Sequence, residues 1–503
     1  MLKEPDQRDP ADGVSVSRRP GFLAVFPSIM LPMFLAVIDQ TIVATALPAI
    51  AAETGQVERV SWIVVSYLIA STVAAPVYGR LGDSFGRRRL MFAALTVFVG
   101  ASLLCAVAPT VELLSAARVL QGLGGGGLMT LSQALIGEAV PPRERARYQG
   151  YLAAVAVSAN TFGPVAGGYL TEHFGWPSIF LVNVPFGLLA MLLARRLPVA
   201  TGERLPWRSD PGGLVLFAIF VATSLFALEQ LQQVDMASLP MGGLLLAAGL
   251  AALWLLLRHE GRVPSPLIPV GLLRQPAIWH SDGMAACHGA ALVSLLTFLP
   301  VYLQVVRGVS PSETGLMLVP LTIGIGVGSL ITGRLVSRTG YTTIFPIVGL
   351  VVATINLVIL AFWAGGLEMT TLAGLMLLIG LFMGTVMGVV QVSVQSAAGP
   401  LRLGEAAASV QFSRSIGAAF GTAMVATLLF AVLAIRNPES ARVFASMVEH
   451  AGHAAPAALP SRGGIPAALQ ADIAFAFKAA FLLIAAFSTG GFLLALTNPQ
   501  RRI

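Results

Sequence analysis

Runs of about 20 apolar residues recur along the whole chain, and each is long enough to cross the hydrocarbon core of a membrane as a helix. The chain has 503 residues, of which 56% are hydrophobic, and its mean hydropathy is +0.81. A soluble globular protein is excluded by this pattern. The sequence therefore predicts an all-α, polytopic membrane protein.

About fourteen spans are expected from the positions of the apolar runs. They lie at about 22–47, 60–78, 90–108, 112–136, 148–170, 178–197, 212–232, 239–258, 279–305, 313–336, 342–364, 370–396, 406–435 and 475–497. The expected organisation is a cytoplasmic tail (1–20), an N-terminal six-helix bundle (21–198), a linker with two additional helices (199–262) and a C-terminal six-helix bundle (263–503) with a long external loop (436–474).

Arginine placement gives the expected orientation. Loops on one side carry clusters of basic residues, namely Arg80, Arg87 to Arg89, Arg143, Arg145, Arg147, Arg195, Arg196, Arg204 and Arg208. By the positive-inside rule this side is the cytoplasm, and both termini lie on it. The net charge of +7 is thus explained by loops that alternate with spans, and a nucleic-acid partner is excluded.

The most highly charged of these loops runs from Gly79 to Leu90, between two apolar runs. It concentrates four arginines and one acid in a chain that is only 11% charged. Asp83 can accept hydrogen bonds from the N-terminal amides of a facing helix, or pair with an arginine. We call the residues of this turn the latch and expect them to hold one of two conformational states: Gly79, Asp83, Gly86, Arg87 and Arg88.

A second copy of the turn stands far downstream. Gly333-Arg334-Leu335 followed by Gly340 repeats the spacing of Gly79-Arg80-Leu81 followed by Gly86, with Ser337 in place of Asp83. Such duplication is typical of transporters built from paired halves. The alternative, that any cytoplasmic loop attracts arginines, stays open for the second copy.

Asp39 and Arg118 are ionisable residues inside apolar runs. Such a residue costs about 2.5–3.5 kcal/mol on insertion and marks a functional site by default. From the helical rise, Asp39 lies roughly 13 Å and Arg118 roughly 9 Å below the outer ends of their spans, so the two could meet. They are the candidates for proton coupling. The alternative is a static buried ion pair.

Several motifs occur in order along the chain. They are Asp39-Gln40-Thr41-Ile42-Val43 with Ala46-Leu47-Pro48, Trp62 with Tyr67-Leu68, the turn at Gly79 to Leu90, Arg118 to Gly122 with Gly124 to Gly127, and Gly163-Pro164-Val165-Ala166-Gly167-Gly168. The turn closely resembles the loop between helices 2 and 3 of the major facilitator superfamily. The whole set resembles the superfamily's drug:proton antiporters with fourteen spans. The resemblance implies a major facilitator fold, with two six-helix bundles plus two inserted helices.

The resemblance also implies an antiporter motif at Gly163, Pro164, Gly167 and Gly168. Glycine supports close packing of membrane helices anywhere, while Pro164 would in addition bend its helix and let the two halves seal and part. There are departures from the family pattern. Ser158-Ala159-Asn160 replaces upstream glycine, and the later helices offer Arg414, with Glu405 at their edge, where the family often has a further acid.

Polar residues in the spans are candidates for the wall of a substrate cavity: Gln121, Asn160, His288, Gln304, Gln391, Gln411 and Arg414. The alternative is that some bond between helices instead, and a lone histidine such as His288 is more often a satisfied core residue. If the cavity holds Asp39 beside Arg118 and Arg414, monovalent cations, neutral compounds and zwitterions should fit better than dications.

No enzyme chemistry is indicated. There is no nucleotide-binding loop ending in GK[ST], no metal-ligand cluster and no nucleophile triad. Cys105 and Cys287 fall inside spans, so neither a disulfide nor a metal site is expected. The protein should therefore need no cofactor and draw on a proton gradient.

The leading hypothesis is a monomeric proton-coupled antiporter of a bacterial inner membrane that exports lipophilic small molecules or drugs by alternating access. Its partners would be protons, a small-molecule substrate and the lipid bilayer. One alternative is the export of a defined amphipathic metabolite, such as an organic anion, an antibiotic or a lipid. Another is a membrane sensor or scaffold that transports nothing.

Overall fold

The computed structural model describes residues 22–56, 59–197, 210–232, 239–263, 266, 270–441, 443–444 and 467–503. The expected tail at 1–20 and most of the expected loop at 436–474 lie outside these residues. Nearly all described residues are helical, and none of them forms a named strand. The prediction of an all-α protein is confirmed.

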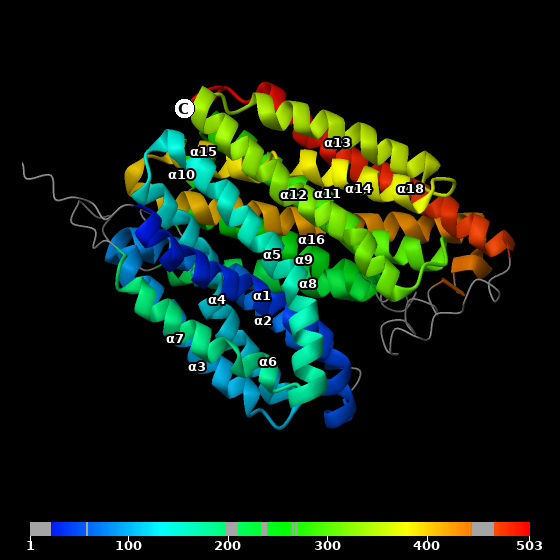
Figure 1. Ribbon diagram of the computed structural model, residues 1–503, viewed down its shortest axis with the longest axis horizontal. Coiled ribbons are helices and arrows are strands. Elements are labelled where there is room, and N and C mark those ends of the chain that lie inside the picture. Colours follow the sequence, from blue (N-terminus) through cyan, green and yellow to red (C-terminus); the bar gives the residue numbers. More distant parts are fainter. Residues whose placement is uncertain are drawn as a thin grey trace, which may run out of the picture.

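The first half of the chain forms a group of helices, coloured blue through cyan to green in Figure 1. They are α1 (Phe22–Thr54), α2 (Ser61–Phe85), α3 (Arg87–Ala106), α4 (Val111–Ala139), α5 (Pro142–Phe174), α6 (Ser178–Leu181) and α7 (Asn183–Ala194). Gly86 alone separates α2 from α3 and has a φ of 95°, a conformation that glycine adopts at little cost. Thr110 caps α4 by accepting a hydrogen bond from the Leu113 N–H.

Two further helices, α8 (Pro211–Gln232) and α9 (Leu239–Glu260), follow. The second half contains α10 (Val270–Leu273), α11 (Pro276–Val305), α12 (Pro311–Thr339), α13 (Ile344–Trp363), α14 (Met369–Met383), α15 (Met387–Ala398), a short 3-10 turn (Pro400–Arg402), α16 (Leu403–Arg436) and α18 (Ala467–Thr497). A capping box between Ser310 and Glu313 fixes the start of α12.

Several expected features differ from the structure. The stretch from Gly79 to Leu90, expected to be a loop, is helical except at Gly86, because α2 continues to Phe85 and α3 begins at Arg87. The span expected at 178–197 consists of α6 and α7, and the one expected at 370–396 is interrupted between α14 and α15. Helix α18 begins at Ala467, so its first turns occupy the end of the segment that the sequence assigned to a loop.

Ten of the described helical stretches are long and apolar enough to cross a membrane, and two shorter apolar stretches span Ser178–Ala194 and Pro211–Ala227. Helices α4 and α5, with 29 and 33 residues, contain more glycine and polar residues and are not among the ten. A polytopic membrane protein is therefore confirmed, while the number of fourteen spans stays a prediction.

The two halves have separate hydrophobic cores. One core joins α1 to α5 with α7, around side chains such as Leu35 and Phe98, and another joins α11 to α14 with α18, around Leu299 and Phe477. The halves meet where α2 packs against α16 and where α5 packs against α12. Helix α8 contacts both α2 and α16, so it lies across the first of these junctions.

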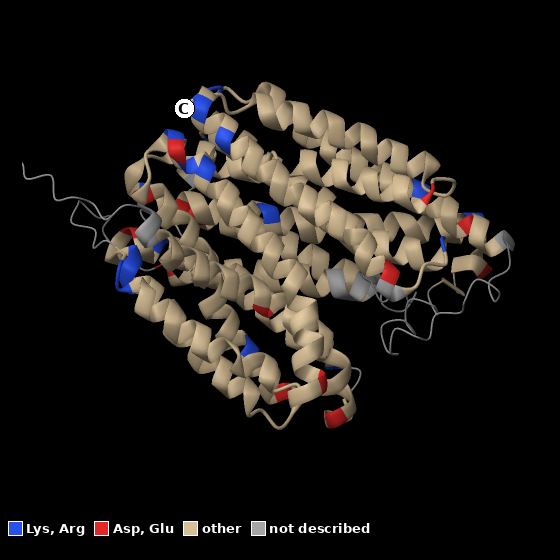
Figure 2. Ribbon diagram, in the orientation of Figure 1, with Lys and Arg blue, Asp and Glu red and all other residues tan. Residues whose placement is uncertain are grey.

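Charged side chains are unevenly distributed. Figure 2 shows most of the Lys and Arg residues at the end of the helices where the C-terminus lies. We call this end, which contains Arg87 to Arg89, the arginine-rich end.

Candidate functional site

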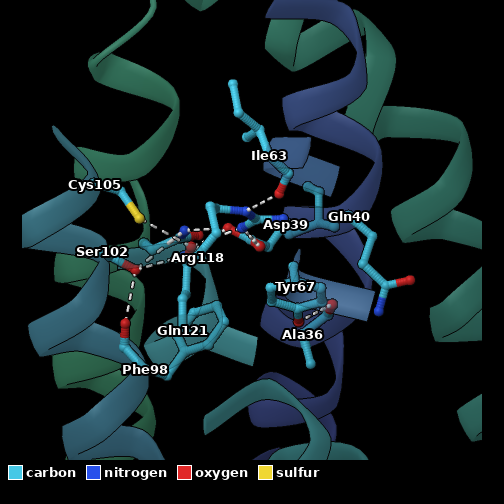
Figure 3. Close-up of polar contacts among 12 residues, drawn as sticks. Ala36, Asp39, Gln40, Ile63, Tyr67, Phe98, Ser102, Cys105, Arg118 and Gln121 are labelled. Carbon is cyan, nitrogen blue, oxygen red and sulfur yellow. Dashed lines mark hydrogen bonds and ion pairs between the residues drawn. The ribbon is translucent and has the colours of Figure 1, made fainter. Parts of the chain in front are cut away.

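Asp39 lies on α1, in the interior of the N-terminal half, and is 0% exposed. Arg118 on α4 donates from Nη1 to Asp39 Oδ2 at 2.5 Å, as Figure 3 shows. The two side chains therefore meet, as their depths along the spans predicted. A buried pair of this kind is stable only when its remaining polar atoms are also satisfied.

The remaining carboxylate oxygen has two partners. Asp39 Oδ1 accepts hydrogen bonds from Gln121 Nε2 and from Asn183 Nδ2, both at 2.8 Å. Gln121 Nε2 also lies 2.9 Å from Ser102 Oγ. Arg118 and Gln121 are three residues apart on one helix face, which lets both reach the same carboxylate. The structure thus places Gln121 in this buried network, and not in a cavity wall as the sequence analysis expected.

Helix α2 holds Arg118 from the other side. Arg118 Nε donates to the Ile63 carbonyl at 3.2 Å, and the guanidinium carbon lies 4.2 Å from the centre of the Tyr67 ring, within range of a cation–π interaction. Gly122 makes this approach possible, because a Cβ there would lie 2.5 Å from the Tyr67 carbonyl oxygen. Part of the glycine run of α4 therefore serves close packing.

The latch residues lie where α2 meets α16. The Asp83 carboxylate accepts the backbone N–H of Gly404 at 3.0 Å and that of Glu405 at 3.1 Å. These amides belong to the first turn of α16, whose unpaired N–H groups favour an anion. A Cβ at Gly79 would lie 2.5 Å from the Gly404 carbonyl oxygen. The helix-capping contact that the sequence suggested for Asp83 is present.

One arginine, Arg87, supports the Asp83 carboxylate from its own half. Arg87 forms an ion pair with Asp83 and a second one with Glu138 of α4, at 2.5 Å. Arg88 is half-buried beside it and has no ion pair with any residue that the structure describes. Of the two adjacent arginines, Arg87 is the one that holds Asp83.

The second copy of the turn lies at the equivalent junction between the halves. A Cβ at Gly333 on α12 would lie 2.4 Å from the Ala146 carbonyl oxygen of α5. The two copies thus pack against α16 and α5, each in the opposite half, as an internal repeat predicts. Ser337 supplies no carboxylate to this second junction.

The glycines of the expected antiporter motif are not equivalent. Gly163 and Gly167 on α5 pack against α1, where a Cβ at Gly167 would lie 2.6 Å from the Ile42 carbonyl oxygen. Gly168 has no neighbouring atom within 4 Å of such a Cβ. Pro164 lies inside α5. The α1–α5 contact therefore depends on Gly163 and Gly167.

A central cavity lies between the two halves. Two adjoining spaces of about 250 and 110 Å³ share Gln40, Met129, Gln411 and Arg414 as lining residues. The wall of the larger one also contains Asn160, His288 and Gln391, as the sequence analysis expected. Gln304 is not among the lining residues.

Sequence reasoning assigned no site role to several polar residues, among them Asn183 in the Asp39 network. Gln149 on α5 lines the cavity, and Asp282 on α11 is a buried acid, 4% exposed. Asp282 Oδ1 accepts from Ser409 Oγ at 3.5 Å, and Oδ2 has no hydrogen bond to the described part of the chain. An acid three residues inside the expected span 279–305 was the signal that could have found Asp282.

The sequence model of the Major Facilitator Superfamily matches residues 29–422. The chain belongs to the major facilitator superfamily. It is therefore a multi-pass membrane protein, and its fold is that of the superfamily.

Relatives within the superfamily include a protein named as a multidrug transporter. The chain is 30% identical over 403 residues to the multidrug transporter protein MdtP of Bacillus subtilis, covering 80% of this chain and 74% of that one. It is 34% identical to an uncharacterized MFS-type transporter, Rv1877, of Mycobacterium tuberculosis, covering 80% of this chain but only 59% of the relative's length.

A solved superfamily structure has the same fold. The human organic anion transporter MFSD10 superimposes with a TM-score of 0.65 at 15% identity, over 95% of this chain and 100% of that one. At this identity the likeness concerns the fold alone.

Proposed function

We propose that this transporter is a proton-coupled exporter of lipophilic small molecules that works by alternating access. The observation that carries the proposal is the buried Asp39 carboxylate, which is held by Arg118, Gln121 and Asn183. A carboxylate inside the membrane is costly, and here its charge is the one that holds Arg118. Protonation would remove that charge, release Arg118 and so link proton binding to the packing of α1 against α4.

The arrangement of the halves supports alternating access. The cavity is walled by both halves, and the contact of Asp83 with the first turn of α16 lies at one end of the junction between them. Rocking of the halves about the cavity would break this contact and expose the cavity at the arginine-rich end. We infer that this end faces the cytoplasm of a bacterium, that both termini lie there, and that the protein acts as a monomer.

Purified protein in liposomes tests the proposal. A pH gradient alone should drive accumulation of a lipophilic fluorescent compound, and an ionophore that collapses the gradient should stop it. The panel should contain neutral, cationic and anionic compounds, together with single amphipathic metabolites, because one strongly preferred compound would favour the export of a defined metabolite. The name of the Bacillus subtilis relative favours a broad specificity.

The non-transporting alternative gives a different result. A sensor or scaffold would bind compounds in the same liposomes without moving them. Absence of flux for every member of the panel, from protein that unfolds cooperatively, would contradict the proposed transport function.

A further inference from the structure

The charged side chains that line the described part of the central cavity are of one sign, positive. Among the described residues that line its two spaces there is no Asp or Glu, and Arg414 of α16 is the only Arg or Lys. Asp39 and Arg118 do not line it; they are 0% and 1% exposed and neutralise each other. The expectation that an acid shares the cavity with Arg414 is therefore wrong.

Arg414 has a single side-chain partner. Its Nη2 donates to Gln411 Oε1 at 3.2 Å, three residues earlier on the same helix. No carboxylate of the described chain lies within ion-pair distance of it, in contrast to Arg118 with Asp39. A guanidinium has five N–H donors and stays charged in proteins. Only one hydrogen bond is made by the Arg414 guanidinium to a described side chain, so it has further donors for a ligand in the cavity that it lines.

Neighbouring polar groups also lack partners. Gln391 is 2% exposed and His288 is 3% exposed, yet both amide atoms of Gln391 and the Nδ1 atom of His288 have no hydrogen bond among the described residues. The same holds for Gln149 Nε2. All three side chains line the same space as Arg414. Buried polar groups are normally paired, so these are groups that a bound ligand can satisfy.

The backbone brings this group together. A Cβ at Gly289 on α11 would collide with the Arg414 carbonyl oxygen, so glycine there lets α16 approach α11 closely. His288 precedes Gly289 on α11. From the helical rise, Arg414 lies about 16 Å from the start of α16 and His288 about 18 Å from the start of α11, which places both near the same depth.

The rest of the wall of the larger space combines apolar side chains with a few neutral polar ones, such as Gln40, Asn160 and Ser329. It consists largely of methionine and aliphatic side chains, among them Met33, Met129, Leu292, Leu296, Ile325 and Met383. Methionine adapts to ligands of different shape. The cavity therefore offers one fixed positive charge with hydrogen-bonding groups beside it, surrounded by an adaptable apolar surface.

We propose that this cavity binds lipophilic organic monoanions, namely carboxylates or sulfonates, with the anionic group on Arg414 and the apolar body against the methionines. Guanidinium–carboxylate and related pairs are charge-assisted and can be bidentate. The inference rests on the proposed function, since it names the charge class that the exporter carries. It differs from the sequence-based expectation, in which monovalent cations, neutral compounds and zwitterions fit better than dications.

Binding to protein in nanodiscs of uncharged lipid tests the inference without any proton gradient. The probes are 2-naphthalenesulfonate and (2-naphthyl)trimethylammonium, which share an aromatic body and differ in the sign of the charge, with empty nanodiscs as the blank. We expect the wild type to bind the sulfonate at least tenfold more tightly than the cation. Arg414→Gln should lose at least tenfold in sulfonate affinity, and Arg414→Lys should lose less.

Arg436→Gln is the matched control, because it removes one arginine from the same helix outside the cavity, at an exposed pair with Asp472. It should leave the affinity for both probes unchanged. Equal or tighter binding of the cation by the wild type overturns the inference, and so does unchanged sulfonate affinity in Arg414→Gln. If Arg414→Gln does not fold, the affinities of the wild type for the two probes decide whether the inference stands.

The result is separable from that of the flux experiment. Anion binding without proton-driven flux would contradict the proposed export and leave the inference standing. Proton-driven flux of cations, with no binding of the sulfonate, would support the proposed export and contradict the inference of an anion site.

Discussion

Asp83 of α2 caps the first turn of α16 through the backbone N–H of Gly404, at 3.0 Å. The two residues are 321 positions apart in the chain and belong to opposite halves, so this contact ties the halves together at the arginine-rich end. Helix capping by a carboxylate is usually a local device within one helix. Here it joins two units that must separate if the protein works by alternating access.

Asp83→Asn should weaken this contact. An amide keeps one acceptor oxygen but turns two N–H donors toward amides that are themselves donors. Hydrogen bonds to a charged group contribute about 1.5–3 kcal/mol, so the population open at the arginine-rich end should rise by roughly tenfold or more. The measurement uses a protein in which Cys105 and Cys287 are replaced by alanine and Met387, in the cavity wall, is replaced by cysteine. The rate at which an impermeant maleimide, applied from the arginine-rich end, labels this cysteine reports how often the cavity is open there. An unchanged labelling rate would mean that Asp83 serves assembly and not gating.

Substitutions of Arg87 and of Arg88 should have very different effects on the labelling of Met387→Cys. Arg87→Gln removes the ion pairs with Asp83 and Glu138, so it should increase the same labelling. Arg88→Gln changes the net charge equally but breaks no ion pair of the described chain, and it should leave labelling close to that of the wild type. Equal effects from the two variants would show that overall positive charge matters here and not the Asp83 contact.

Asp39→Asn should abolish export driven by a pH gradient, because the amide cannot take up a proton. Exchange of substrate across liposomes without a gradient should persist, since the amide still accepts a hydrogen bond from Arg118. Glu53→Gln is the control: it neutralises an exposed acid on the same helix, at its far end. Full gradient-driven export by Asp39→Asn would remove this residue from the proposed coupling.

The Asp39–Arg118 pair can also be tested through stability. Arg118→Gln alone leaves a buried carboxylate without a cation, and breaking a buried pair in this way costs about 3–5 kcal/mol. The double variant Asp39→Asn with Arg118→Gln leaves two neutral groups and should recover most of the loss. Thermal unfolding in nanodiscs measures all four proteins. Strict additivity of the single variants would contradict a direct interaction.

Alanine substitutions at Gly167 and at Gly168, two adjacent glycines of the motif on α5, should have different effects. Gly167→Ala would place a methyl group 2.6 Å from the Ile42 carbonyl oxygen, so it should separate α1 from α5 and lower the unfolding temperature and transport together. Gly168→Ala meets nothing within 4 Å and should be tolerated. A similar loss in both would indicate that the backbone flexibility of α5 matters more than its packing.

The sequence predicted contacts that depend on depth and on local chemistry. The helical rise placed Asp39 and Arg118 at compatible levels, and the single acid of the turn suggested that Asp83 caps a facing helix. It could not predict which face of a helix a residue occupies relative to other helices. Gln121 was therefore expected in the cavity, although it bonds to Asp39. That Arg414 has no ion pair with a described carboxylate became visible only when every neighbouring helix was in place.

Asp282 and the break between α14 and α15 show the same limit. An apolar run defines a span by its mean hydropathy, which a single acid near one end hardly changes. The interruption after Met383 falls at Gly384 and Thr385, but glycines occur in many spans of this chain, so these two residues did not distinguish a break from a continuous helix. Both features depend on tertiary packing, which a linear pattern does not contain.

The position of α8 across the junction of α2 and α16 has a mechanical consequence. Its contacts there are between apolar side chains, among them Phe217 and Phe220 against Phe412 of α16. Apolar contacts have no preferred direction, so α8 can keep its contacts with both α2 and α16 while these two helices move relative to each other. The resistance to this movement would then come from directional bonds between the halves, such as those from α16 to Asp83 and the one from Gln395 Nε2 to the Gln133 carbonyl, and changes at these bonds would alter the speed of the cycle.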